Sequence, residues 1–430
     1  METNVFEEVE SEVRAYCRNW PAVFDRARGS HVYDRDGRAY LDFFTGVATL
    51  SYGHNHPVLK RALLDYLERD GLMHSLDTYT VAKEEFLHRF REHVLTPRQL
   101  DYKVMFPAPT GTNAVEAALK LARKVTGRTT VARFANGFHG LTLGSLALTS
   151  NALKRGAAGV PLGHALTLAY DGYLDDPMAG LTWLARLLDD PGSGEEPPAA
   201  VIVEVVQGEG GLTAARPQWL QALAGICRRH NVLLIVDDVL MGCGRTGPFF
   251  SFESAGIEPD IVCLSKALSG YGLPFALTLF RSDLDVWRPG EHSGTFRGNN
   301  AAFVTAATAL ETFWAGGGLE QQTAQKSEHL RAGLAGIVAE HADAGAAVRG
   351  SGLAIGLFLE PEGLATATCR AAFERGLLVE ACGPRRQVVM LLPPLTASVE
   401  ELTTGLDLLT DALTHARQLA DGRPRVPSLR

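Results

Sequence analysis

A run of five apolar residues, Val232-Leu-Leu-Ile-Val236, constrains the fold of this chain more than any other feature. Such a run is typical of a central strand in a parallel sheet that is covered on both faces. The other predicted elements alternate around it, as strands at 103–106, 130–134, 199–206 and 261–264 and helices at 113–125 and 219–229. This alternation predicts an α/β fold with a doubly wound, mainly parallel sheet. Ligands bind such sheets at the carboxyl ends of the strands.

The length of the chain predicts more than one lobe, because 430 residues exceed what a single simple core holds. We expect a large domain over 56–310 and a smaller α+β domain over 311–420. An N-terminal segment, 1–55, is expected to pack with the small domain. The tail, 421–430, is rich in Pro and Arg and is expected to be loose.

Composition excludes several classes of function. The net charge of −8 and the scattered basic residues argue against a nucleic-acid partner. The six cysteines contain no C-x-x-C pair, so no zinc or other metal site is predicted, and they fit a reducing cytoplasm. The acidic stretch Met1–Glu12 is unlike a signal peptide, and no apolar run reaches membrane-spanning length. A cytoplasmic protein without a membrane partner is therefore expected.

Two residues that follow predicted strands are the main chemical candidates. Asp237 ends the apolar run, where burial of a carboxylate is unfavourable without a positive partner such as a protonated pyridine nitrogen. Lys266 follows the 261–264 strand among small residues. Desolvation there lowers the pKa of the amine and makes it available for a Schiff base. The alternatives are a capping or loop aspartate and a solvated surface lysine.

An anion site is predicted at the start of the 113–125 helix. Thr110-Gly-Thr112 offers backbone N–H groups and hydroxyls that suit a phosphate, although simple N-capping is the alternative. Asn113 with Glu116 resembles a capping box. The Gly-rich loop Ser293–Asn300 could add a hydroxyl to the same phosphate.

Phe138-His139-Gly140 follows the 130–134 strand and could stack an aromatic ring on a flat cofactor. A core Phe beside a surface His is the alternative. A further motif, Gly242-Cys-Gly-Arg-Thr-Gly247, matches the G-x-G-x-x-G pattern of dinucleotide sites. That fingerprint requires a helix directly after the glycines, whereas Pro248-Phe-Phe-Ser-Phe252 follows here. A nicotinamide cofactor is therefore not expected.

The order of these signals resembles the class III aminotransferases of fold type I. Asp237 follows a central strand, Gly244-Arg-Thr-Gly247 comes soon after, Ser265-Lys266 follows the next strand, and Thr295-Phe-Arg-Gly-Asn299 lies further on. The resemblance runs from about residue 32 to 413. Several longer runs are most similar to the diaminobutyrate aminotransferases of ectoine biosynthesis, at 52–55, 101–104, 109–123, 241–253 and 264–274.

The resemblance implies pyridoxal 5′-phosphate as cofactor. Lys266 would bond to it and then carry the substrate proton, while Asp237 would keep its pyridine nitrogen protonated. Thr295 would reach the phosphate bound by a neighbouring subunit, which implies a homodimer or a larger assembly.

The resemblance also implies the remaining cofactor contacts. Gly111 and Thr112 would hold the phosphate. Val239 would pack on one face of the ring and Phe138, with its neighbour His139, on the other.

Three positions depart from patterns found in this family. Leu240 stands where many members have a Gln that contacts the phenolic oxygen of the cofactor. Leu141 replaces an Arg of ornithine- and GABA-type members, which argues against those substrates. Met390 replaces the Arg with which glutamate-using members bind an α-carboxylate.

Met390 leaves Glu209 without the arginine that this residue often gates in the family. We hypothesise that Arg385 or Arg386 takes over the carboxylate. A second hypothesis is that Glu209 binds the distal ammonium of a diamine substrate.

The resemblance therefore implies an ω-aminotransferase that interconverts L-2,4-diaminobutyrate and aspartate 4-semialdehyde, with glutamate and 2-oxoglutarate as the second pair. An alternative keeps the cofactor but predicts a decarboxylase, racemase or aminomutase. A non-catalytic sensor is a third reading, but regulators of this fold add a DNA-binding segment that is not seen before residue 32.

Overall fold

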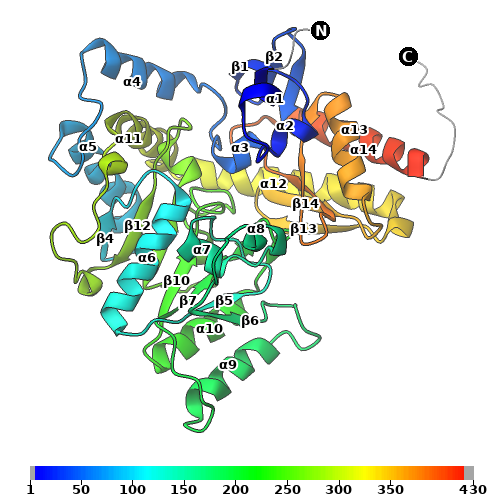
Figure 1. Ribbon diagram of the computed structural model, residues 1–430. Helices are drawn as coiled ribbons and strands as arrows, with labels where there is room; N and C mark the ends of the chain where they lie inside the picture. The colour runs from blue at the N-terminus through cyan, green and yellow to red at the C-terminus, as the bar shows by residue number, and fades with distance from the viewer. Residues whose placement is uncertain (1–4, 421–430) are drawn as a thin grey trace.

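The computed structural model describes residues 5–420, and its larger lobe is built on a seven-stranded sheet (Figure 1). The strands, in spatial order, are β4 (Tyr102–Met105), β12 (Leu277–Arg281), β11 (Ile261–Leu264), β10 (Leu233–Asp237), β7 (Ala200–Val203), β5 (Val131–Phe134) and β6 (Ala165–Leu168). β12 is antiparallel to both neighbours, and the other pairs are parallel. The predicted α/β fold with a mainly parallel sheet is confirmed.

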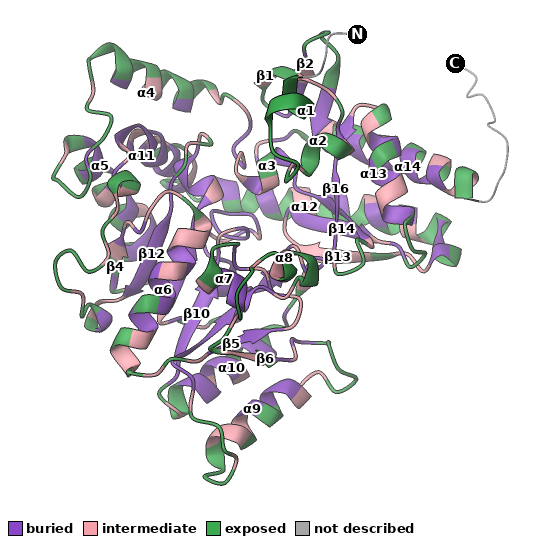
Figure 2. Cartoon of the chain, in the orientation of Figure 1, coloured by how far each residue is buried: buried purple, intermediate pink, exposed green. Residues whose placement is uncertain are grey.

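Helices on both faces of the sheet explain the apolar run of β10. Leu233 and Ile235 pack in the core that contains α6 (Gly111–Thr126), whereas Leu234 and Val236 pack in the core that contains α10 (Pro217–Arg229). Successive side chains of a strand point to opposite faces, so each residue from Leu233 to Val236 must be apolar. Figure 2 shows the central strands buried and the outer faces of the helices exposed.

Three predicted details of this lobe differ from the structure. The expected strand at 199–206 is divided between β7 and β8 (Val206–Gln207), and β8 pairs with β9 (Thr213–Ala214) in a separate two-stranded sheet. β6 was not expected, because it is an edge strand with partly exposed side chains. β12 was also not expected, and Thr278 and Arg281 interrupt its apolar pattern.

The smaller lobe follows α11 (Asn300–Trp314) and α12 (Gly318–Glu340). Its antiparallel sheet has the order β13 (Ala347–Ser351), β14 (Ala354–Phe358), β17 (Val388–Leu391) and β16 (Glu380–Cys382). The two helices that complete it are α13 (Leu364–Glu374) and α14 (Val399–Ala420). The predicted domain boundary at residue 310 falls inside α11, and the division into domains stays a prediction.

The N-terminal segment lies beside this smaller lobe (Figure 1). Its strands β1 (Phe24–Arg28), β2 (His31–Asp34) and β3 (Ala39–Asp42) form a sheet with β15 (Leu377–Leu378), in which β3 and β15 are parallel. The predicted loose tail at 421–430 lies outside the described residues.

The other helices are α1 (Val5–Val9), α2 (Tyr16–Asn19), α3 (Thr45–Ala48), α4 (Pro57–Glu68), α5 (Val81–Phe90), α7 (Leu143–Leu148), α8 (Ala152–Gly156) and α9 (Ala179–Asp189).

No helix within residues 5–420 is long and apolar enough to cross a membrane.

Candidate active site

A cavity of about 450 Å³ lies where β10 and β11 end and α6 begins. Most of the predicted site residues line it, although they are far apart in the sequence. They are Gly111, Thr112, Phe138, His139, Glu209, Asp237, Val239 and Lys266. The site therefore lies at the carboxyl edge of the sheet, where ligands bind in folds of this kind.

Lys266 enters the cavity two residues after the end of β11, as the first residue of a short 3-10 helix, Lys266–Ser269. Its backbone has a φ of +51°, a left-handed conformation that side chains other than glycine rarely adopt. Such strain is found mainly at functional sites. Burial lowers the pKa of the Lys266 amine, although Glu209 and Asp237 oppose this effect. A lysine with a lowered pKa is available as a nucleophile.

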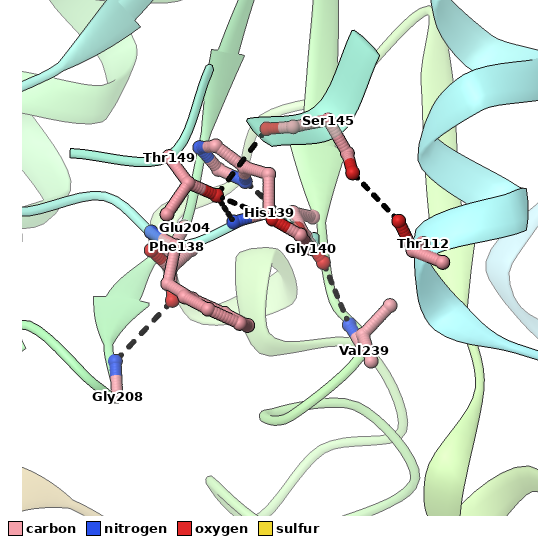
Figure 3. A network of polar contacts seen from close by, with 10 residues as sticks. Thr112, Phe138, His139, Gly140, Ser145, Thr149, Glu204, Gly208 and Val239 are labelled. Atoms are coloured by element: carbon pink, nitrogen blue, oxygen red, sulfur yellow. Dashed lines mark hydrogen bonds and ion pairs between the residues drawn. The ribbon is translucent and has the colours of Figure 1, made fainter. Parts of the chain in front are cut away.

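Asp237 ends β10 and is fixed by two hydrogen bonds. His139 Nδ1 lies 2.8 Å from Oδ2 of Asp237, and the backbone N–H of Val239 donates to Oδ1 at 3.2 Å. Figure 3 shows His139 held in turn by Thr149, whose Oγ1 accepts the His139 backbone N–H at 3.0 Å. His139 is only 3% exposed. The alternative reading of a surface histidine is therefore wrong.

The N-terminus of α6 faces the cavity, and its cap is not the predicted one. The N-cap is Thr110, and the side chain of Asn113 accepts a hydrogen bond from the Thr110 N–H at 3.3 Å. Glu116 does not close a capping box with Asn113. It instead accepts hydrogen bonds from Thr142 Oγ1 at 2.6 Å and from the backbone of Ser145 at 3.0 Å. The helix therefore starts two residues earlier than predicted, which places Gly111 and Thr112 in its first turn.

Gly111 and Thr112 are closely surrounded. A Cβ on Gly111 would lie 2.8 Å from Val239 Cγ1, so only glycine lets the helix approach this side chain. The hydroxyl of Thr112 lies 2.6 Å from Ser145 Oγ (Figure 3) and 2.7 Å from Thr142 Oγ1. This arrangement gathers hydroxyls and backbone N–H groups at the positive end of the helix dipole, where an anion is stabilised.

Glu204 is a buried carboxylate that the sequence analysis missed. It follows β7, accepts the Phe138 N–H at 2.8 Å and the Gly208 N–H at 3.3 Å (Figure 3), and is 7% exposed. Burial raises the pKa of Glu204 to about 7, an effect that His139 opposes. A carboxylate directly after an apolar strand is the signal that identified Asp237, and it could have identified Glu204.

Lys154 is the second residue of the cavity that was missed. It lies on α8, with its Nζ 3.6 Å from Oε2 of Glu209 and 4.3 Å from the ring centroid of Phe138. Nothing in the local sequence of a five-residue surface helix predicts this position, because it depends on how the helix packs.

Leu141 and Leu240, two of the three positions that depart from the family pattern, line the cavity. Leu240 lies so close to Gly208 that a Cβ there would be 2.1 Å from Leu240 Cδ2. Met390 is buried in β17 and is not among the lining residues.

Neither arginine proposed for carboxylate binding lines the cavity. Arg386 pairs with Glu380, and Arg385 borders a separate cavity. Thr295 is exposed in the short helix Thr295–Arg297 and does not line the cavity either.

The fold and the site define an aminotransferase. The chain belongs to the class III aminotransferases, because the model of the family "Aminotransferase class-III" matches residues 14–413. Solved structures with the same fold include the ornithine aminotransferase of Toxoplasma gondii, with a TM-score of 0.84, 26% identity and coverage of 97% of this chain and 94% of that one. An aminotransferase of Bacillus anthracis aligns with a TM-score of 0.85 at 24% identity, over 96% of this chain and 100% of that one.

More similar relatives are named diaminobutyrate–2-oxoglutarate transaminase. The protein of Nocardia farcinica is 60% identical over 99% of both chains. That of Streptomyces avermitilis is 58% identical over 95% of this chain and 97% of its own length. These names favour amino transfer over the decarboxylase, racemase and aminomutase alternatives.

Proposed function

We propose that the chain transfers an amino group between L-2,4-diaminobutyrate and 2-oxoglutarate, with pyridoxal 5′-phosphate held in the Lys266 cavity. The products would be aspartate 4-semialdehyde and glutamate. The observation that carries the proposal is the convergence of Lys266, Asp237 and the N-terminus of α6 on one cavity. The names of the relatives in Nocardia and Streptomyces support the choice of substrates.

The residues present fit this cofactor. The first turn of α6 suits its phosphate, and the Toxoplasma ornithine aminotransferase is described with PLP at partial occupancy in its active site. Asp237 is a buried carboxylate whose Oδ2 meets His139 and whose Oδ1 accepts the Val239 N–H, so Oδ1 keeps a second lone pair for a protonated ring nitrogen. The tight approach of Gly111 to Val239 leaves an apolar wall against which a flat ring can pack.

Each residue then has a defined task. When bound, pyridoxal phosphate supplies an electron sink for the carbon that bears the amino group. Lys266 would hold the cofactor and move the proton at that carbon. Asp237 would hold the proton on the ring nitrogen, and His139 orients Asp237 through the contact at Oδ2. Phe138 and Val239 hold the two faces of the ring.

We further propose that a second copy of the chain completes the site. Thr295 is exposed, and so is the apolar side chain of Phe296 beside it, at 69%. Phe296 and His74 meet edge to face, with their ring centroids 5.7 Å apart. A homodimer would cover the exposed Phe296 ring and bring Thr295 to the partner's phosphate site.

The six cysteines, all unpaired, support a cytoplasmic location.

The two half-reactions test the proposal. L-2,4-diaminobutyrate alone should change the visible spectrum of the cofactor-loaded enzyme, and 2-oxoglutarate alone should then restore it with release of glutamate. Lys266→Met is the matched control and should lower turnover by at least about 10³-fold, because it removes the general base. An unchanged spectrum with diaminobutyrate would reject the substrate, and failure to bind pyridoxal phosphate would reject the cofactor.

A further inference from the structure

Lys154 is the only side-chain cation among the cavity-lining residues apart from Lys266, all of which lie in the described part of the chain. In the proposed function, Lys266 binds the cofactor and does not bind the substrate carboxylate. The family arginine is absent, because Met390 stands in its place and is buried in β17. A substrate carboxylate in this cavity therefore has Lys154 as its available charged partner.

The position of Lys154 is fixed by its helix. Asn151 caps α8 by accepting the N–H of Lys154 at 3.0 Å. The neighbouring Arg155 donates from Nη1 to the carbonyl oxygens of Leu146, Ala147 and Thr149, at 3.0–3.1 Å. These bonds attach α8 to the end of α7, so the Lys154 side chain is directed over Phe138 and toward Glu209.

Glu209 is anchored from the other side of the cavity. Its carbonyl oxygen accepts the N–H of Gly383 at 2.9 Å, in the loop after β16 of the smaller lobe. Its carboxylate lies 3.6 Å from Lys154 Nζ, which is longer than a hydrogen bond, and the two side chains are 36% and 32% exposed. An ion pair this long and this exposed to water contributes little to stability, so a charged ligand can separate the two side chains easily.

We propose that the Lys154–Glu209 pair opens to bind the distal amino-acid group of the donor, with the carboxylate on Lys154 and the ammonium on Glu209. This inference rests on the proposed function. A donor that reacts at its terminal amine presents a zwitterion at its other end, and an ion pair is complementary to a zwitterion. When a 2-oxo dicarboxylic acid binds, its distal carboxylate takes the same place on Lys154. The Glu209 carboxylate is then displaced from Lys154.

Three donors with the same reacting amine separate the two contacts. L-2,4-diaminobutyrate carries both distal charges, 4-aminobutyrate carries only the carboxylate, and 1,3-diaminopropane carries only the ammonium. Lys154→Met should lower the ratio of kcat/KM for diaminobutyrate to that for diaminopropane by about 10- to 100-fold, and Lys154→Arg should restore it. Glu209→Gln should instead lower the ratio of kcat/KM for diaminobutyrate to that for 4-aminobutyrate. Equal losses with all three donors in either variant would overturn the proposal.

A binding measurement keeps this test independent of turnover. Glutarate is a dicarboxylate that cannot react, and calorimetry on the cofactor-loaded enzyme should show saturable binding that Lys154→Met weakens at least about tenfold. Lys154→Arg is the matched control and should bind glutarate nearly as the wild type does. Equal affinity in the Met variant, or no binding to the wild type, would reject Lys154 as the carboxylate site. A wild type that binds glutarate through Lys154 but does not react with diaminobutyrate would reject only the proposed substrate.

Discussion

His139 and Asp237 form a buried pair at the base of the active-site cavity, with Nδ1 of the imidazole 2.8 Å from Oδ2 of the carboxylate. The two residues are 3% and 7% exposed. Burial of a carboxylate is unfavourable without a hydrogen-bonding partner, and His139 supplies one before any ligand binds. The cavity is therefore preorganised to receive a positive group at Oδ1 of Asp237, which otherwise accepts the backbone N–H of Val239.

The first prediction concerns the loss of this partner. His139→Leu leaves the buried carboxylate of Asp237 with only the Val239 N–H as a donor, so the unfolding free energy of the cofactor-free protein should fall by about 1–3 kcal/mol. His139→Asn is the control, because the amide of Asn can still donate to the carboxylate. Its unfolding free energy should fall clearly less than that of His139→Leu. Chemical denaturation measures both variants, and equal losses would show that packing rather than charge pairing dominates.

The second prediction follows from Glu204, whose pKa burial raises from 4.5 to about 7. The folded state then holds this proton more tightly than the unfolded state. The stabilising contribution is complete below pH 4.5 and is lost as the pH rises through 7. Glu204→Gln cannot lose a proton, so its unfolding free energy relative to wild type should increase by about 3 kcal/mol between pH 5 and pH 8. Parallel curves for the two proteins across this range would contradict the assignment.

The sequence predicted the residues whose positions depend on the central sheet. Asp237 is the last residue of β10 and Lys266 comes two residues after the end of β11, and neighbouring parallel strands bring their carboxyl ends to the same edge. Lys154 could not be predicted in this way, because α8 is placed by the hydrogen bonds of Arg155 to carbonyl groups of another helix. The cap of α6 was misplaced because Glu116 finds its partners in a segment about thirty residues away along the chain.

The third prediction uses the close approach of α6 to Val239. Gly111→Ala introduces a Cβ 2.8 Å from Val239 Cγ1, which must displace the Val239 side chain. This shift should also disturb the backbone N–H that Val239 donates to Asp237. Such overpacking costs about 1–3 kcal/mol, so the affinity for pyridoxal phosphate should fall about tenfold or more. Absorbance titration of the apoenzyme measures the affinity.

The double variant Gly111→Ala with Val239→Ala is the control for the third prediction. It removes the atoms that the new methyl group meets and should bind the cofactor better than Gly111→Ala alone. A double variant that binds no better would mean that the added methyl group acts on the phosphate site rather than through Val239.

The fourth prediction concerns Thr295, which is exposed and lies outside the cavity of its own chain. If a second copy supplies this hydroxyl, Thr295→Glu should repel the phosphate in the partner's site and inactivate the homodimer. Lys266→Met should also be inactive, because it removes the lysine from the cavity of its own subunit. Co-expression of the two variants forms mixed dimers in which one site has both Lys266 and Thr295 intact. Random mixing should restore about a quarter of the wild-type activity per subunit, because half of the dimers carry one complete site. Activity no greater than that of the separate variants would place Thr295 within the site of its own chain or outside the site altogether.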